Sequence, residues 1–236
     1  MQAVILAAGA GSRLRPLTLD TPKTLLPLHD LPLIEHILNA LPDTITEIIL
    51  VVGYKRVQVH RRLGSTWKGR PIQYVLQTKQ AGTGDALHRT KQYLHNRFLV
   101  LNGDDLYTKA DLEHLIAHPI AILLHTTMAP VLSSALLDKA GNFVGIENHA
   151  PAHEEKRQIC GAYVLDERFF HYPLVSVLVR GRQELSVPHT LVELSKDIPV
   201  HAEQASWWQP VGTLAELQEA RAHLSYGSCN VTFDGS

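Results

Sequence analysis

The sequence predicts an α/β fold, built as an open, mostly parallel mixed sheet with helices on both faces. Short runs rich in Val, Ile and Leu, typical of strands buried on both faces, alternate with segments long enough for crossover helices. A glycine-containing turn follows the first of these runs directly. Hydrophobic residues make up 45% of the 236 residues and charged residues 19%, and both values are typical of a globular domain.

The first half of the chain carries the regular alternation. The predicted parallel core strands are Gln2–Ala7, Glu47–Val52, Ile72–Leu76 and Phe98–Leu101. The predicted crossover helices are Leu33–Leu41, Tyr54–Leu63 and Gly84–Tyr93. Such an alternation is Rossmann-like, and ligands of these sheets bind beyond the carboxyl ends of the strands.

The second half has a different pattern. Ser134–Leu137 and Phe143–Glu147 flank the turn sequence Asp138-Lys139-Ala140-Gly141-Asn142, which predicts a hairpin. The remaining predicted strands are Ile120–His125, Ile159–Leu165 and Pro199–Gln204, and the predicted helices are Val187–Leu194 and Thr213–Leu224. No linker separates the halves, so we expect residues 1–225 to form one domain. Residues 226–236 are polar and glycine-containing, and we expect a loose tail there.

Charge and composition limit the kinds of partner that the chain is expected to bind. A formal net charge of −1 gives no electrostatic reason to expect nucleic acid or an acidic membrane. No stretch approaches the length of a membrane span, and the two cysteines, Cys160 and Cys229, are too few for a disulfide framework. We therefore expect a protein of the reducing cytoplasm, and the sequence leaves an oligomer open.

Histidine is abundant, with 14 residues, and this raises the question of a metal site. His114 and His118 have the i, i+4 spacing that places two side chains on one helix face. No third ligand and no His-Glu-x-x-His pattern accompanies them, so we assign no metal to the histidines at this stage.

The turn after the first strand has the chemistry of a phosphate-binding loop. It reads Leu6-Ala7-Ala8-Gly9-Ala10-Gly11-Ser12-Arg13-Leu14-Arg15-Pro16-Leu17-Thr18, with Thr21-Pro22-Lys23 close behind. Glycines let backbone N–H groups approach an anion, and the arginine and lysine add fixed positive charge. Leu14 occupies the place of the third glycine of a dinucleotide fingerprint, and no Gly-Lys-Ser/Thr ending of a P-loop is present.

This turn resembles the opening motif of the sugar-1-phosphate nucleotidyltransferases, which reads Leu-Ala-Ala-Gly-x-Gly-Ser/Thr-Arg-Leu-x-Pro-Leu-Thr followed by Pro-Lys. The family includes glucose-1-phosphate thymidylyltransferases and N-acetylglucosamine-1-phosphate uridylyltransferases. The resemblance implies an enzyme that joins a nucleoside triphosphate, UTP or dTTP being favoured, to a sugar 1-phosphate and releases pyrophosphate. It implies Mg²⁺ as cofactor, a nucleotide-binding half (1–110) and an acceptor-binding half (111–225).

The same resemblance assigns residues in the first half. Nucleotide binding is implied for Leu6, Ala8, Gly9, Gly11 and Ser12, and catalysis for Arg13 and Lys23. Gln77, Gly82 and Thr83 match the family's base-reading segment, and a glutamine amide offers both a donor and an acceptor to a base edge. Asp104, in Asn102-Gly103-Asp104-Asp105 after the strand Phe98–Leu101, matches the family's Mg²⁺ ligand. Asp105 is expected to point to the other side as a turn residue.

The acceptor half departs from the family. Glu147 and Gly161 match acceptor-binding positions, but Asn148 stands where a lysine is usual and Ser133 where a glycine is usual. Pro210, in Trp208-Gln209-Pro210-Val211-Gly212-Thr213, replaces the aspartate of the family's Trp-x-Asp-x-Gly-Thr segment. Three functions therefore stay open: an active sugar-1-phosphate nucleotidyltransferase, a nucleotide-binding regulatory or partner subunit without transfer activity, and a cytidylyltransferase for a small phospho-alcohol such as phosphocholine.

Overall fold

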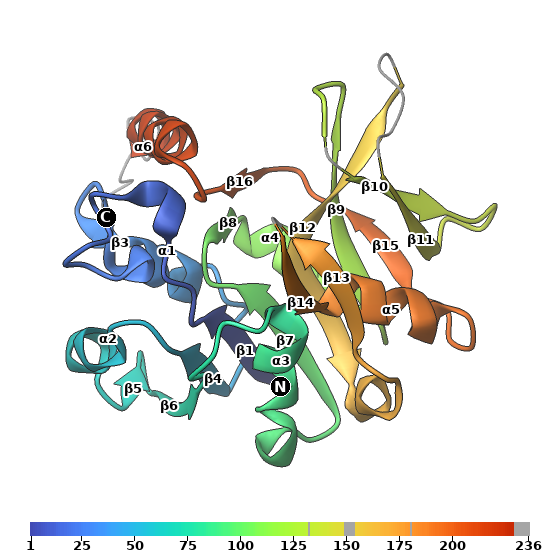
Figure 1. The fold of residues 1–236 in the computed structure, drawn as a ribbon, viewed down its shortest axis with the longest axis horizontal. Helices are drawn as coiled ribbons and strands as arrows, with labels where there is room; N and C mark the ends of the chain where they lie inside the picture. The colour runs from blue at the N-terminus through green and yellow to red at the C-terminus, as the bar shows by residue number, and fades with distance from the viewer. Residues whose placement is uncertain (132, 149–153, 180, 229–236) are drawn as a thin grey trace, which may run out of the picture.

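The computed structural model of the chain describes residues 1–131, 133–148, 154–179 and 181–228 (Figure 1). A central sheet has the strand order β15-β9-β12-β7-β1-β4-β6-β5. Its strands are β1 (Gln2–Ala7), β4 (Glu47–Val52), β5 (Thr66–Trp67), β6 (Arg70–Leu76), β7 (Arg97–Asn102), β9 (Ala121–Thr127), β12 (Lys156–Asp166) and β15 (His201–Gln204).

The sheet is mostly parallel in its first half and mixed in its second. β1 pairs in parallel with β4 and with β7, and β4 pairs in parallel with β6. β12 is antiparallel to both β7 and β9, whereas the edge strand β15 is parallel to β9. The predicted open, mixed α/β sheet is therefore confirmed.

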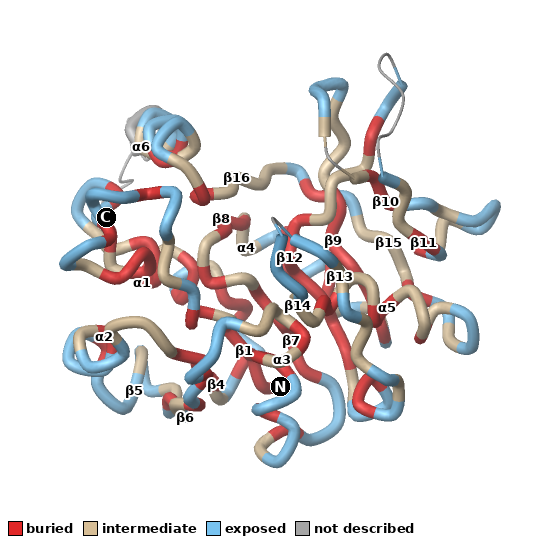
Figure 2. Tube along the Cα trace, viewed as in Figure 1, coloured by how far each residue is buried: buried red, intermediate tan, exposed pale blue. Residues whose placement is uncertain are grey.

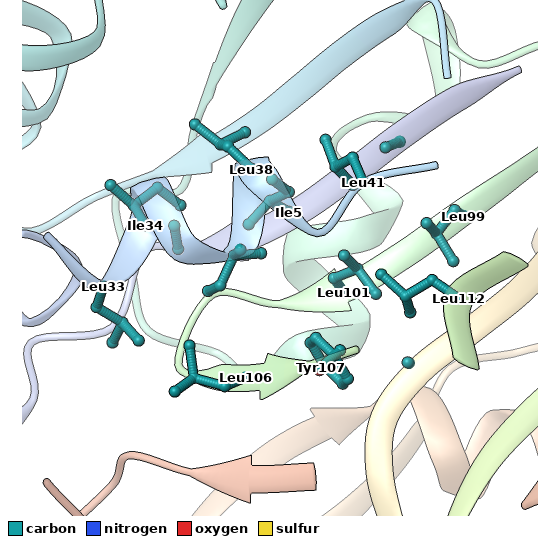
Figure 3. Close-up of a cluster of buried hydrophobic side chains, with 14 of the residues drawn as sticks. Ile5, Leu33, Ile34, Leu38, Leu41, Leu99, Leu101, Leu106, Tyr107 and Leu112 are labelled. Atoms are coloured by element: carbon teal, nitrogen blue, oxygen red, sulfur yellow. The ribbon is translucent and has the colours of Figure 1, made fainter. Parts of the chain in front are cut away.

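Helices cover both faces of this sheet. The α-helices are α1 (Leu33–Asn39), α2 (Arg56–Leu63), α3 (Thr83–His88), α4 (Lys109–Leu115), α5 (Val187–Ser195) and α6 (Leu214–Ser228). Alternate residues of β1 point to opposite faces, so that Ile5 joins one buried cluster and Val4 the other. The Ile5 cluster packs under α1, α2, α4 and α6 (Figure 3), and the Val4 cluster packs under α3 and α5. Buried positions accordingly run through the central strands in Figure 2.

Short elements complete the described chain. Paired strands outside the central sheet are β2 (Pro27–Leu28) with β3 (Leu31–Pro32), β8 (Asp105–Tyr107) with β16 (Trp208–Pro210), β10 (Ser133–Leu137) with β11 (Phe143–Asn148), and β13 (Val175–Val179) with β14 (Arg182–Ser186). The 3₁₀ turns are η1 (Ser12–Leu14), η2 (Lys23–Leu25), η3 (Lys91–Tyr93) and η4 (Glu167–His171). The hairpin around Asp138 is confirmed as β10–β11, with Asp138 Oδ1 accepting the N–H groups of Ala140 and Asn142 at 2.8 Å each.

Two expectations need correction, and one hairpin was not predicted. The single helix expected over Gly84–Tyr93 ends at His88, where the Thr90 hydroxyl donates to Leu87 O over 2.7 Å and a 3₁₀ turn follows. The hairpin β13–β14 was not predicted. Helix α6 extends to Ser228, three residues into the segment expected to be a loose tail, and residues 229–236 lie outside the described part of the chain.

Two points drawn from composition, the cysteines and the membrane-span length, can be compared with the structure. Cys160 is a free, buried thiol, and Cys229 lies outside the described residues. Within the described ranges, no helix combines the length and the apolar composition that crossing a membrane requires.

Candidate active site

A cavity of about 400 Å³ opens at the carboxyl ends of β1 and β7. Its lining residues are Leu6, Ala7, Ala8, Gly9, Arg13, Lys23, Thr24, Gln77, Gln80, Gly82, Thr83, Ala86, Asn102, Gly103, Asp104 and Glu184. We call this space the first cavity. It lies where ligands of open parallel sheets bind, and its volume is typical of a small-molecule site.

The glycine turn after β1 forms one wall of the first cavity. A Cβ built on Gly9 meets no described atom within 4 Å, so the backbone at Gly9 borders open space. Gly11 has a left-handed φ of 62°, and a Cβ there would lie only 2.8 Å from Lys23 Cβ. Gly11 and Ser12 do not line the cavity; Gly11 instead lets the loop fold closely against Lys23.

Lys23 and Asp104 meet across the first cavity. Lys23 follows Pro22 at the start of η2, and its ammonium group donates to the Asp104 carboxylate from 81 residues away in the chain. The Lys23 side chain is 7% exposed, whereas the Asp104 side chain is 39% exposed. Asp104 thus presents carboxylate oxygen to the cavity while its charge is balanced by a nearly buried cation.

Arg13 also lines the first cavity and lies against the turn that follows β16. A Cβ built on Gly212 would come within 2.7 Å of Arg13 Nη2 and 3.0 Å of Glu216 Oε2. The Glu216 carboxylate accepts the Gly212 N–H over 2.7 Å. Gly212 therefore lets the ends of the Arg13 and Glu216 side chains approach the backbone at the start of α6.

Gln77 follows β6 and is buried with a fixed amide orientation. Its Nε2 donates to Gly82 O over 3.0 Å and to Asp85 Oδ2 over 2.8 Å. Asp85 is held in turn by Arg89, and the hydrogen bonds from Arg89 and Gln77 keep the pKa of the Asp85 carboxyl below its ordinary value despite the opposing effect of burial. Both amide hydrogens of Gln77 are thereby used, which leaves Oε1 as its acceptor, and Gln77 lines the first cavity.

Gly82 and Thr83 are packed against the β13–β14 hairpin. A Cβ on Gly82, whose φ is 98°, would lie 2.3 Å from Leu185 O. Leu185 N donates to Ala81 O over 2.8 Å, and Val187 N donates to the Thr83 hydroxyl over 3.1 Å. The glycine predicted to read the base is therefore also required for docking β14, which brings Glu184 to the cavity wall.

Asp105, unlike Asp104, is buried away from the first cavity. Its Oδ2 accepts from Asn102 Nδ2 over 3.0 Å. Burial, and after it the charge of Asp104, raise the pKa of the Asp105 carboxyl well above its usual range. Pro210 of β16 lies opposite Asp105 in the strand pairing. The segment expected to bring a second carboxylate thus passes beside Asp104 and Asp105 with a proline in that place.

A second cavity, of about 300 Å³, adjoins the first and shares Thr83, Asn102 and Glu184 with it. The rest of its lining is Ser133, Ile146, Ile159, Gly161, Tyr163, Val177, Val179, Leu185, Ser186, Pro188 and His189. Burial lowers the pKa of His189, which favours its neutral form. Among these described lining residues there is no lysine or arginine.

Of the two residues predicted to contact the acceptor, Gly161 lines the second cavity and Glu147 lines neither described cavity. Gly161 has a φ of 70° in an irregular part of β12, and a Cβ there would lie 2.0 Å from Asn102 Nδ2. The Tyr107 hydroxyl donates to the carbonyls of Cys160 and Gly161 and so holds this bend. Glu147 pairs with Ser134 in the β10–β11 hairpin, whereas its neighbour Ile146 on β11 lines the second cavity.

Several cavity residues were not assigned from the sequence, among them Asn102, Gln80 and Glu184. Asn102 was part of the Asn-Gly-Asp-Asp segment, and its place at the end of a central strand was an available signal. Gln80 precedes the Gly82 turn and had no distinguishing pattern. Glu184 belongs to the unpredicted β14 and reaches the site through long-range packing only.

The fold and the residues around the first cavity together define a class of ligand-binding protein. An α/β domain whose glycine turn, two cations, exposed carboxylate and buried amide surround one cavity is suited to bind a phosphorylated, base-containing ligand. Comparison with known proteins gives the family. Residues 2–131 match the nucleotidyl transferase family, and the chain belongs to it.

Similar proteins agree with this assignment. The bifunctional protein GlmU of Methanocaldococcus jannaschii is 29% identical over 230 residues, which cover 95% of this chain and 54% of that protein. The UTP–glucose-1-phosphate uridylyltransferase AglF of Haloferax volcanii is 37% identical over 108 residues, covering 45% of this chain and 44% of that protein. The chain spans about half the length of these curated relatives.

Solved structures share the fold. A putative glucose-1-phosphate thymidylyltransferase from Bacillus anthracis superposes with a TM-score of 0.81 and 27% identity, covering 100% of this chain and 98% of that one. The inositol-1-phosphate CTP transferase from T. maritima superposes with a TM-score of 0.73 over 96% of each chain. Its 19% identity makes it a likeness of fold alone.

Proposed function

We propose that this chain transfers a nucleotidyl group from a nucleoside triphosphate, UTP or dTTP, to a sugar 1-phosphate, giving an NDP-sugar and pyrophosphate. The observation that carries the proposal is the gathering of Arg13, Lys23 and Asp104 around one cavity at the carboxyl ends of β1 and β7. The uridylyl- and thymidylyltransferases among the similar proteins support the same reaction.

The reaction requires the protein to position the two substrates and to stabilise the negative charge that develops. A phosphate oxygen of the acceptor attacks the α-phosphorus, a new P–O bond forms, and the bond from the α-phosphorus to the bridging oxygen of the β-phosphate breaks. Pyrophosphate leaves with that electron pair. Phosphate is already a competent nucleophile, so no covalent catalyst is needed. Arg13 would stabilise the leaving pyrophosphate and Lys23 the α-phosphate.

Magnesium fits the donor set of the first cavity. Mg²⁺ in such sites is held by one or two carboxylates together with substrate phosphates, and Asp104 offers a partly exposed carboxylate there. When bound, the ion would neutralise phosphate charge. The Lys23–Asp104 ion pair holds both side chains together at the wall of the first cavity.

The orientation of the Gln77 amide bears on which nucleotide base the site would accept. Its Nε2 is committed to Gly82 O and Asp85, so Oε1 is the group available to a ligand. Uracil and thymine present an N3–H donor to such an acceptor, whereas cytosine has an unprotonated N3 in the same place. This supports UTP or dTTP over CTP as the donor.

A second candidate acceptor follows from the second cavity. Its described walls combine aliphatic and polar side chains and carry the Glu184 carboxylate without a lysine or arginine. A carboxylate with no lysine or arginine beside it suits an acceptor whose non-phosphate part is cationic. A small phospho-alcohol such as phosphocholine is therefore the alternative to a sugar 1-phosphate.

A third candidate is a nucleotide-binding subunit without transfer activity. Pro210 replaces the aspartate that the resemblance leads one to expect, and its side chain cannot ligate an ion. The retained Arg13 and Lys23 favour the active enzyme, because both serve a developing charge and not binding alone.

Pyrophosphate release with Mg²⁺ tests these candidates together. The purified chain is incubated with each of UTP, dTTP, CTP, GTP and ATP in combination with glucose 1-phosphate, N-acetylglucosamine 1-phosphate or phosphocholine. We expect release with UTP or dTTP and a sugar 1-phosphate. Release only with CTP and phosphocholine would select the second candidate, and normal UTP binding without release from any pair would select the third.

A further inference from the structure

Three side chains meet at the edge of the central sheet, outside both cavities. His118 lies in the connection between α4 and β9, and His201 and Glu203 lie on the edge strand β15. None of the three lines the first or second cavity. We call His118, His201 and Glu203 the edge triad.

The ligand atoms of the edge triad converge. Glu203 Oε2 lies 3.1 Å from His118 Nε2 and 3.4 Å from His201 Nε2. One donor atom from each residue lies within 4.8 Å of the other two. The two imidazole rings stack with centroids 3.6 Å apart and an interplanar angle of 17°.

We propose that the edge triad binds a divalent transition-metal ion, with zinc as the best match. Zinc takes imidazole nitrogen and carboxylate oxygen at about 2.0–2.2 Å in tetrahedral geometry, which places neighbouring ligand atoms roughly 3.3–3.5 Å apart. The two nitrogen–oxygen separations in the edge triad, 3.1 and 3.4 Å, lie close to that distance. Two imidazoles with one carboxylate favour zinc over Mg²⁺, which prefers all-oxygen sites.

Binding requires one local change. Two near-parallel imidazoles direct their in-plane lone pairs side by side, so the rings must splay apart to aim at a common ion. The His118 and His201 side chains are 32% and 42% exposed, which leaves room for this rotation. The same exposure lets water complete the fourth position.

Hydrogen bonds to the backbone already hold the segments that carry the edge triad in place. His201 N donates to Ile120 O over 2.9 Å, and Arg97 Nη1 donates to His118 O over 2.7 Å. These bonds hold the loop before β9 beside β15, so that side-chain rotation alone brings the ligands together. A bound ion would join the α4–β9 loop to the edge strand and thereby stabilise this end of the sheet.

Zinc binding is measured by isothermal titration of the metal-stripped full chain, in excess Mg²⁺ so that oxygen-rich sites are occupied. We expect one zinc per chain and an increase in melting temperature. His118→Ala and Glu203→Gln should each weaken binding by about tenfold or more. The matched control is His114→Ala, which removes an exposed histidine of α4 one turn away and should leave binding unchanged.

A second readout does not depend on the variants folding. Co²⁺ added to the wild-type chain should give the intense visible absorption of a tetrahedral site with nitrogen ligands, and zinc should abolish it. Wild-type chain that takes up no zinc, Co²⁺ absorption typical of octahedral coordination, or equal zinc affinity in folded His118→Ala and wild type would each overturn the proposal. These measurements need no nucleotide, so they are independent of the transfer reaction.

Discussion

Pro210 of β16 lies directly opposite Asp105 of β8, and the following residue, Val211, donates its N–H to Asp104 O over 2.9 Å. The segment that carries Pro210 is therefore tied to the end of β7, where the proposed metal ligand stands. A proline side chain adds no charge there. The proposed enzyme thus relies on Asp104 and the substrate phosphates to hold Mg²⁺, and its metal affinity without nucleotide should be weak.

A carboxylate restored at position 210 should make transfer less dependent on high Mg²⁺ concentration. We expect Pro210→Asp to lower the Mg²⁺ concentration that gives half-maximal transfer, because a second oxygen ligand would join Asp104. The measurement is the rate against Mg²⁺ at saturating nucleotide. Pro210→Ala is the matched control, since it also frees φ and adds an N–H but supplies no carboxylate. Equal Mg²⁺ demand in the two variants would mean that another residue completes the site.

Arg13 should be essential for transfer and dispensable for folding. It is exposed and lines the first cavity, so its loss removes charge without opening the core. We expect Arg13→Ala to lower kcat by about a hundredfold or more, the usual effect of losing one preorganised electrostatic contact. Arg15→Ala, at an exposed arginine that does not line the cavity, should retain most activity. A folded Arg13→Ala protein with near wild-type kcat would remove Arg13 from the mechanism.

The neighbouring aspartates should behave differently. Asp104→Asn removes the cavity-facing carboxylate and should abolish most Mg²⁺-dependent transfer. Asp105→Asn should have a small effect, because burial already favours the neutral Asp105 carboxyl and an asparagine oxygen can accept the same bond from Asn102. Steady-state rates of the two variants at matched Mg²⁺ decide the point. Greater loss in Asp105→Asn would reverse the assignment.

Gly82 should be required by packing as well as by backbone conformation. A Cβ there would meet Leu185 O at 2.3 Å, whereas Gly64, with a φ of 67°, has no described atom within 4 Å of its would-be Cβ. We expect Gly64→Ala to cost about 1–2 kcal/mol from backbone strain alone and Gly82→Ala to cost at least about 1 kcal/mol more. Denaturant unfolding of both variants measures the difference. Equal losses of unfolding free energy in the two variants would show that β14 shifts to make room for the added methyl group.

The central sheet was predictable because its strands are encoded locally. Parallel strands buried on both faces leave continuous apolar runs, and β1, β4, β6 and β7 lie close to the expected ranges. The turn residues of the β10–β11 hairpin are likewise a local signal, with Asp138 accepting two backbone N–H groups.

Long-range contacts explain what the sequence did not reveal. Glu184 reaches the cavity because Gly82 lets β14 pack closely, and nothing near Glu184 in the sequence indicates this. Spacing paired His118 with His114, yet the structure places His118 beside His201 and Glu203 of β15. Glu147 was assigned by a matching sequence position, but on β11 its neighbour Ile146 lines the second cavity and Glu147 does not.

Transfer of a labelled α-phosphate tests the central claim most directly. The chain is incubated with UTP labelled at the α-phosphorus, Mg²⁺ and glucose 1-phosphate, and the products are separated. The account predicts that label moves into a UDP-sugar in equal amount to the pyrophosphate released, and that Arg13→Ala and Asp104→Asn lose both products together. Label recovered only as UTP or UMP, across all donor and acceptor pairs and with nucleotide binding intact, would contradict it.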